Sequence, residues 1–250
     1  MSATKADRPI QDTLEWAIRR MQDKGYSVRS SVKLSVDPKL AIMGYAKAER
    51  NGHVIVISEW ALDSEMLGGL VLHELAHIYF TEQGAHSHDG VTLERILGGM
   101  KEREGLRNRE VECLVDSFNH LQNILVDDVV FDVMDERERE AANRFFSEWV
   151  SDRPSGEPIA DATAACRNAF AEASLRRRNL WDPQSEMSYR NKEFLSALKG
   201  QAENEYDWIE NFLERATPMW GKKKYSKAIR EYFDRVLSLM RSSASMYDMR

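Results

Sequence analysis

The sequence has few cysteines and no long apolar run. Cys113 and Cys166 are its two cysteines in 250 residues, which excludes a disulfide framework and is typical of a reducing compartment. No stretch reaches the roughly 18 consecutive apolar residues of a membrane-spanning helix. The segment from Met1 to Asp12 is polar and lacks the apolar centre of a signal peptide. We therefore expect a cytoplasmic protein with no membrane partner.

A strong excess of charge of either sign is also lacking. The chain carries 35 Lys and Arg against 41 Asp and Glu, a formal net charge of −6. This balance argues against a protein whose main task is to neutralise phosphates. Two short basic runs, Arg176–Arg178 and Lys222–Lys224, are more typical of solvated helix faces than of phosphate contacts. Nucleic acid is therefore not the expected partner, but the two basic runs leave nucleic-acid binding as an alternative.

What the sequence does contain is an apolar stretch with His73-Glu74-Leu75-Ala76-His77 at its centre. Positions four apart share one face of a helix, so His73 and His77 point the same way. Two imidazoles at this spacing can bind one Zn²⁺ at about 2.0–2.1 Å each. Glu74 lies beside such a metal without binding it, where a general base would take a proton from water. Burying these polar groups without partners would be costly, and a metal supplies the partners.

These five residues resemble the HExxH signature of the zincin metallopeptidases. In zincins a short sheet lies beside the active-site helix, and its edge strand binds the substrate in extended form. The resemblance implies a zinc metalloendopeptidase with Zn²⁺ as cofactor and a peptide or protein as substrate, which the cysteine content and the polar N-terminus place inside the cell. Glu74 would assist a zinc-bound water in the hydrolysis of the peptide bond.

The order of predicted elements agrees with that resemblance over about the first 135 residues. A helix is expected over residues 9–24, followed by a strand at Val32–Val36 that alternates apolar and polar residues. Two further strands, Ala41–Glu49 and His53–Ser58, flank an Asn-Gly turn that predicts a hairpin. The motif helix and a long apolar helix at Glu112–Met134 complete this part.

From Glu136 onward the periodicity is helical throughout. The fold class predicted is therefore α+β, with a zincin-like core in residues 1–135. Residues 136–250 are expected to form a helical C-terminal region packed on that core, because no Gly/Ser-rich or Pro-rich linker separates the two parts. A protein partner bound by this helical region is a further expectation.

A catalytic zinc site needs a third protein ligand, and the long helix offers one. Asp116, His120, Asn123 and Asp127 fall at i, i+4, i+7 and i+11, on one stripe of an otherwise apolar helix. The stretch from Asn123 to Asp127 resembles the Asn-x-x-x-Asp segment of minigluzincin-like peptidases. On that resemblance Asp127 is the predicted third ligand, with the neighbouring Asp128 as an alternative. The oxyanion also needs a donor, for which the sequence offers His120 on this stripe and His86 or His88 in the loop after the motif helix, without choosing among them. Asn123 and Asp116 are expected to support the ligands.

The loop after the motif helix offers other ligands, His86 and His88. SprT-like proteases, which cut proteins crosslinked to DNA, take a third His from this region, usually at longer spacing. The metzincin pattern requires a His at the position of Gln83 and does not apply. A DNA-associated SprT-like protease is therefore one alternative function. Another is a non-catalytic protein in which zinc pins a helical partner-binding surface, although a structural zinc site has no use for Glu74.

Overall fold

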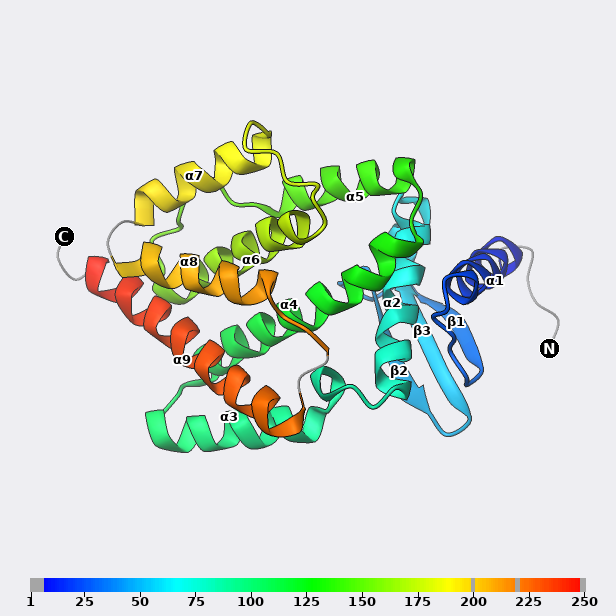
Figure 1. Ribbon diagram of the computed structural model, residues 1–250, viewed down its shortest axis with the longest axis horizontal. Helices are drawn as coiled ribbons and strands as arrows, with labels where there is room; N and C mark the ends of the chain where they lie inside the picture. The colour runs from blue at the N-terminus through cyan, green and yellow to red at the C-terminus, as the bar shows by residue number, and fades with distance from the viewer. Residues whose placement is uncertain (1–6, 199–200, 219–220, 248–250) are drawn as a thin grey trace. The chain divides into compact units, whose positions relative to one another are not determined.

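The computed structural model describes residues 7–198, 201–218 and 221–247, so the first half of the polar N-terminal segment, residues 1–6, lies outside it. The chain forms two compact units, which are not successive in sequence. The first comprises Met1–His88 and Val126–Ala142, and the second comprises Asp89–Leu125 and Asn143–Arg250. The expected boundary at residue 135 falls inside the later segment of the first unit. Figure 1 shows that the chain forms one small sheet and is otherwise largely helical in its described residues, and the predicted α+β class is confirmed.

The sheet of the first unit has three strands, β1 (Val32–Asp37), β2 (Gly44–Glu49) and β3 (Gly52–Ser58). Their order is β1-β3-β2, with β1 parallel and β2 antiparallel to β3. The residues from Val54 to Ile57 are all buried, as their continuous apolar run predicts for a strand covered on both faces. The hairpin is also confirmed, because Glu49 pairs with Gly52 around a two-residue turn.

The start of β3 requires a glycine at position 52, because the backbone conformation there is unfavourable for other residues and no space remains for a side chain. Its φ is +142°, and a Cβ added there would lie 2.2 Å from the carbonyl oxygen of Ser31. The same carbonyl accepts a hydrogen bond from the backbone N–H of His53 at 2.9 Å. Any larger residue at position 52 would push β3 away from the segment that leads into β1.

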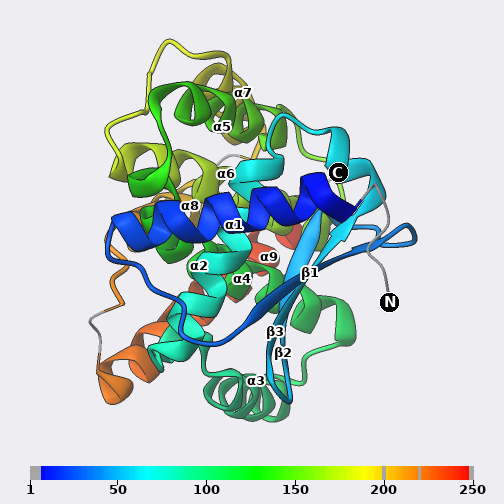
Figure 2. The same ribbon diagram turned by 90° about the vertical axis from the view of Figure 1, so that its right-hand side faces the viewer.

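Two helices pack in the first unit beside the sheet. Helix α1 (Asp7–Asp23) buries Leu14, Ala17 and Met21. The short 3₁₀ segment η1 (Glu59–Asp63) leads into α2 (Leu67–Glu82), which carries the HExxH motif and contacts both α1 and the sheet. A Cβ at Gly68 would lie 3.1 Å from the Trp16 ring, so a small residue is needed where α2 meets α1. Figure 2 shows α1 lying across α2 and beside the strands.

The later segment of the first unit is attached to α1 through Arg20. Its guanidinium donates to both carboxylate oxygens of Glu138, at 2.9 and 2.8 Å, and to the Val133 carbonyl at 2.6 Å. Glu138 also accepts from the backbone N–H of Asp135, whose carboxylate accepts from the N–H of Glu138. This reciprocal capping starts α5 (Glu136–Trp149) directly after α4 (Asn108–Val133).

The second unit is helical in its described residues. It contains the first part of α4, the end of α5 and five further helices. These are α3 (Gly90–Glu104), α6 (Pro158–Arg177), α7 (Glu186–Leu198), α8 (Gln201–Glu214) and α9 (Lys222–Tyr247). Its largest fully buried side chains are aromatic: Phe170, Phe194, Tyr206, Tyr232 and Phe233. Helix α4 begins four residues before the expected Glu112, because the backbone N–H of Arg107 and its side chain bind Glu110 and start the helix there.

The side chains of the first basic run, Arg176–Arg178, bind acceptors within the second unit. Arg176 pairs with Glu210 at 2.6 Å, Arg177 donates to the Glu214 carbonyl at 2.7 Å, and Arg178 donates to the Ile124 carbonyl at 2.9 Å. The run Lys222–Lys224, in contrast, is exposed at the start of α9. Within the described parts of the chain, every helix is too short or too polar to cross a membrane.

Candidate metal centre

The two histidines of the motif face each other on α2. Nε2 of His73 and Nε2 of His77 lie 3.2 Å apart. Two ligands at about 2.0–2.1 Å from one tetrahedral zinc are separated by about 3.3–3.4 Å. The helix therefore already holds the two nitrogens at the spacing that a zinc ion requires. The side chain of His73 keeps 24% of its surface exposed, which leaves the pair accessible.

Asp127 contacts the other ring nitrogen of His73. Its Oδ1 lies 3.2 Å from Nδ1, and its side chain is only 7% exposed. A carboxylate there holds the proton on Nδ1 and leaves the Nε2 lone pair for a metal. The structure thus brings the predicted third ligand to the motif, but against the nitrogen that points away from His77. Its neighbour Asp128 is half-buried near Tyr26, whose pKa is raised by burial, by Asp132 and, more weakly, by Asp128.

His88 joins the motif histidines from the loop after α2. It lies in the short 3₁₀ segment η2 (His86–His88), and its Nε2 is 2.9 Å from Nδ1 of His77. Its ring stacks on Phe80, with centroids 5.4 Å apart. Burial, reinforced by nearby His73, lowers the pKa of His88 to about 4. His88 is therefore neutral at pH 7 and has a lone pair to offer, whereas the other candidate of this loop, His86, is half-buried in the same segment.

These contacts form one chain of side chains, from Ser87 to Asp127. Ser87 Oγ lies 3.0 Å from Nδ1 of His88, and the line continues through His77 and His73 to the carboxylate. Among the residues described, no three His, Cys, Asp or Glu side chains are arranged as a complete metal site. The reason is geometric: His88 and Asp127 each meet the outer nitrogen of a motif histidine, while only two Nε2 atoms face each other.

Glu74 points toward the sheet, as expected of a residue off the face of the two histidines. It is 6% exposed, and its carboxylate accepts a backbone hydrogen bond from Ala46 on β2. Burial raises the pKa of Glu74, and the attraction of His73 and the Ala46 hydrogen bond oppose this rise. A buried carboxylate with a raised pKa beside two imidazoles is suited to accept and return a proton.

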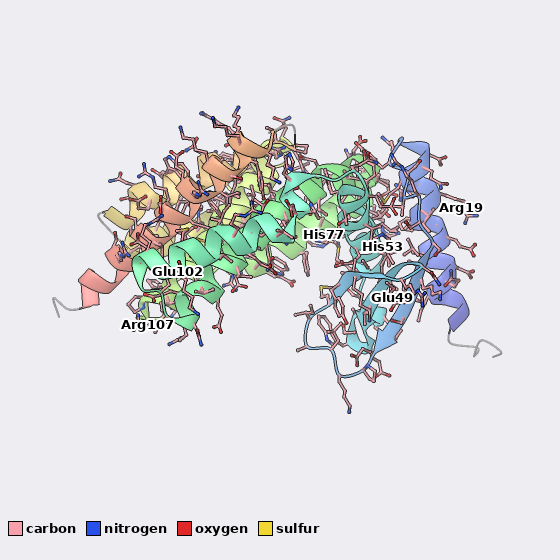
Figure 3. The ribbon with its side chains drawn as sticks, turned by 90° about the horizontal axis from the view of Figure 1, so that it is seen from below. Arg19, Glu49, His53, His77, Glu102 and Arg107 are labelled. Carbon is pink, nitrogen blue, oxygen red and sulfur yellow. The ribbon has the colours of Figure 1, made fainter. Side chains whose placement is uncertain are left out.

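Glu82, at the end of α2, holds the motif helix against the strands, a role that no sequence pattern predicts. Its carboxylate accepts from the backbone N–H groups of Arg29 and Ser30, at 2.6 and 2.9 Å, just before β1. Nε2 of His53, on β3, lies 3.5 Å from the same carboxylate. Figure 3 labels His53 on its strand and His77 on its helix. These partners are far from Glu82 in sequence, so no local pattern could indicate the contact.

The rest of the predicted stripe lies on the part of α4 that belongs to the second unit. Asp116 is exposed, and Asn123 is half-buried. His120 stacks on Phe170, with ring centroids 5.1 Å apart, and its Nδ1 is shielded from solvent without a hydrogen-bond partner. Burial, with the nearby charge of Arg167, lowers the pKa of His120 to about 4. The stripe is therefore divided between the two units, and the oxyanion role of His120 stays a prediction.

The first unit is thus an α+β assembly in which an HExxH helix lies beside a small mixed sheet, with Glu74 bound to β2. The chain belongs to a family of unknown function, DUF5781, whose model matches residues 16–189. The matched range includes the sheet, the motif helix, η2 and all of α4. No curated protein and no solved structure matches the chain.

Proposed function

We propose that the protein is a zinc-dependent metallopeptidase of the HExxH type. The observation that carries this proposal is the 3.2 Å separation of Nε2 of His73 and Nε2 of His77. Asp127 on the outer nitrogen of His73 and the buried Glu74 support it. The cytoplasmic location expected from the sequence is part of the same proposal.

For the third ligand we favour His88, the alternative from the loop, over Asp127. The Asp127 carboxylate already binds Nδ1 of His73, where it orients the ring. His88 is neutral, lies beside His77 and carries its Nε2 toward the motif. A rotation of the His77 or His88 ring is needed to bring the third Nε2 to the first two. Asp127 as ligand remains the competing assignment, and zinc measurements on variants distinguish the two.

Bound zinc would supply a Lewis acid that polarises a peptide carbonyl and makes water more acidic. Glu74 takes the proton from the attacking water, and its raised pKa suits that task. The same carboxyl then gives the proton to the departing amine. Ala46 holds the Glu74 carboxylate beside β2, an edge strand of the described sheet. A substrate extended along that edge would pass next to the base.

The test is the substitution Glu74→Gln, which keeps the size of the side chain and removes its basicity. The variant should bind zinc at close to one per chain and unfold at nearly the wild-type temperature. Its hydrolysis of a mixed-peptide digest with added zinc, read by mass spectrometry, should fall by about 10²–10⁴-fold. Equal cleavage by wild type and variant would show that Glu74 is not the base.

His73→Ala provides the contrasting variant. It should lose the metal, because one of the two facing Nε2 atoms is gone, and should unfold at a lower temperature. If it kept one zinc per chain, the metal would be bound elsewhere and the proposal would be wrong.

A further inference from the structure

The side of β2 that faces away from β3 carries the backbone groups of alternate residues. The backbone N–H of Ser58 donates to the Met43 carbonyl at 2.9 Å, so this pair is hydrogen-bonded across the two strands. Bonded and non-bonded pairs alternate in an antiparallel ladder. The backbones of Tyr45 and Lys47 therefore face β3, and that of Ala46 faces away, which agrees with its bond to Glu74. Apart from the Ala46 N–H, which Glu74 already binds, this outer side of β2 is a template for an added strand next to the candidate base.

The side chains of Tyr45 and Lys47 stand on the face of the sheet away from α2. Gly44 marks the opposite face, because a Cβ added there would lie 3.5 Å from Leu70 of the motif helix. Tyr45 keeps 36% of its surface exposed, and the Lys47 side chain 49%. A strand paired to β2 would place alternate side chains beside these two.

Two large exposed apolar residues flank the Tyr45 end of the β2–β3 pair in the chain. Ile42 and Trp60 are each 55% exposed, unusual values for large apolar side chains. Both lie within two residues of the Met43–Ser58 hydrogen bond, which holds their segments together. An apolar residue next to Tyr45 would remove part of the exposed Tyr45 surface from water.

Basic charge follows at the Lys47 end of the same face. In register, Lys47 and Lys33 lie on either side of Val54, on the neighbouring strands. Glu49 is 3.6 Å from the Lys47 ammonium and offsets one of the two charges. At this end of the face one positive charge remains in excess and attracts an acidic side chain, whereas Asp37, on the same face of β1, lies at the opposite, Tyr45 end.

We propose that this face selects the substrate: an extended peptide with an apolar residue beside Tyr45 and an acidic residue two positions along, beside Lys47. The inference rests on the proposed function, because the peptide is bound next to Glu74. Same-face residues of a strand are about 6.6–6.8 Å apart, so one peptide reaches both side chains. Tyr45 and Lys47 are specificity residues and take no part in the chemistry.

The test uses three end-capped synthetic peptides that share one Phe and differ two residues along, in Glu, Gln or Lys. Their binding to zinc-loaded Glu74→Gln protein is measured by fluorescence polarisation at low salt. The Glu peptide should bind about two- to fivefold more tightly than the Lys peptide, the usual worth of an exposed pair. Lys47→Glu, made in the same background, should reverse this order. Tyr45→Ala should weaken all three peptides by about two- to fivefold, and Lys227→Glu on α9 should leave the order unchanged.

The inference is overturned if the three peptides bind equally, if none binds, or if Lys47→Glu keeps the wild-type order. Cleavage by the wild-type enzyme separates this result from the proposed function. Cleavage of all three peptides at equal rates would retain the peptidase and discard the selecting face. The expected binding order without any cleavage by zinc-loaded wild type would retain the face and discard the peptidase.

Discussion

At the scale of single residues, the two nitrogens of the His73 ring have different partners. Nδ1 faces the buried Asp127 carboxylate, while Nε2 faces His77. A carboxylate on the outer nitrogen keeps the proton there and raises the basicity of the inner one. Asp127 thus prepares His73 for a metal without having to bind it.

Two substitutions distinguish the orienting role from the ligand role. Asp127→Asn keeps a hydrogen-bond acceptor for Nδ1 but loses the negative charge, so zinc affinity should fall by about 10–100-fold while one zinc per chain still binds. His88→Ala removes the favoured third ligand and should leave well under one zinc per chain after dialysis. Zinc content by elemental analysis and affinity by competition with a chelator provide the measurements.

His86→Ala is the matched control, since it changes the same loop and should retain the metal. If His88→Ala keeps its zinc while Asp127→Asn loses it altogether, Asp127 is the third ligand, as the sequence predicts.

The motif residues could be predicted from the sequence, but the ring nitrogen of His73 that the Asp127 carboxylate contacts could not. The spacing of His73, Glu74 and His77 is local, and helix geometry alone decides which of them share a face. Asp127 is 54 residues away from His73, and which ring nitrogen it meets depends on how α4 packs against α2. Periodicity places a residue on a face of its own helix, and it carries no information on the partner atom.

At the scale of elements, a pairing between neighbours in sequence could again be predicted, and a pairing between distant segments could not. The hairpin of β2 and β3 could be predicted, because an Asn-Gly turn between two strand-like runs specifies it. The parallel pairing of β1 with β3 has no local signal, and it makes β3 the central strand and β2 the edge beside Glu74. The identity of the edge strand, on which the proposed substrate site depends, therefore required the structure.

Helices α6 and α8 place two carboxylates, one buried and one half-buried, around one guanidinium. Arg176 lies 2.6 Å from Glu210 and 3.7 Å from Glu172. Burial raises the pKa of Glu210 to about 7; Arg176 opposes this rise, and the charge of Glu172 adds to it. The folded state therefore holds a proton on Glu210 that the unfolded chain releases near the ordinary glutamate pKa of 4.5.

This linkage predicts that the second unit is less stable at pH 7.5 than at pH 5.5. The stabilisation from Glu210 is complete below the unfolded pKa and is lost as the pH rises toward the folded pKa of about 7. The expected loss is on the order of 2 kcal/mol. Hydrogen exchange of the α6 and α8 amides at the two pH values measures it. Glu210→Gln should flatten the dependence, whereas Glu203→Gln, an exposed change on α8, should not; an unchanged slope in Glu210→Gln would refute the assignment.

At the scale of the whole molecule, the two units interleave along the chain. The second unit takes residues 89–125 from the middle of the sequence, and α4 then continues into the first unit at Val126. Composition and periodicity favour a boundary at residue 135, where the pattern turns fully helical. They cannot reveal an insertion of this kind, because helix α4 has the same apolar character on both sides of Leu125.

The interleaving predicts that a fragment of residues 1–135 does not remain a soluble, folded monomer. Within the second unit, the Tyr232 hydroxyl of α9 donates to the Ser117 carbonyl at 3.1 Å, and Phe118 packs near Phe233, with ring centroids 6.5 Å apart. The fragment keeps α3 and all of α4 but removes α9, so buried residues such as Leu114 and Phe118 become exposed. Contiguous apolar surface of this kind leads to association.

Size-exclusion chromatography with light scattering, together with dye binding to exposed apolar surface, compares the fragment with the full chain. We expect large assemblies and strong dye binding for the fragment, and neither for the full chain at the same concentration. A monomeric 1–135 fragment that binds one zinc per chain would show that residues 89–125 fold without the rest of the second unit. Such a result would restore the boundary at residue 135 and place the whole metal centre in an independent N-terminal domain.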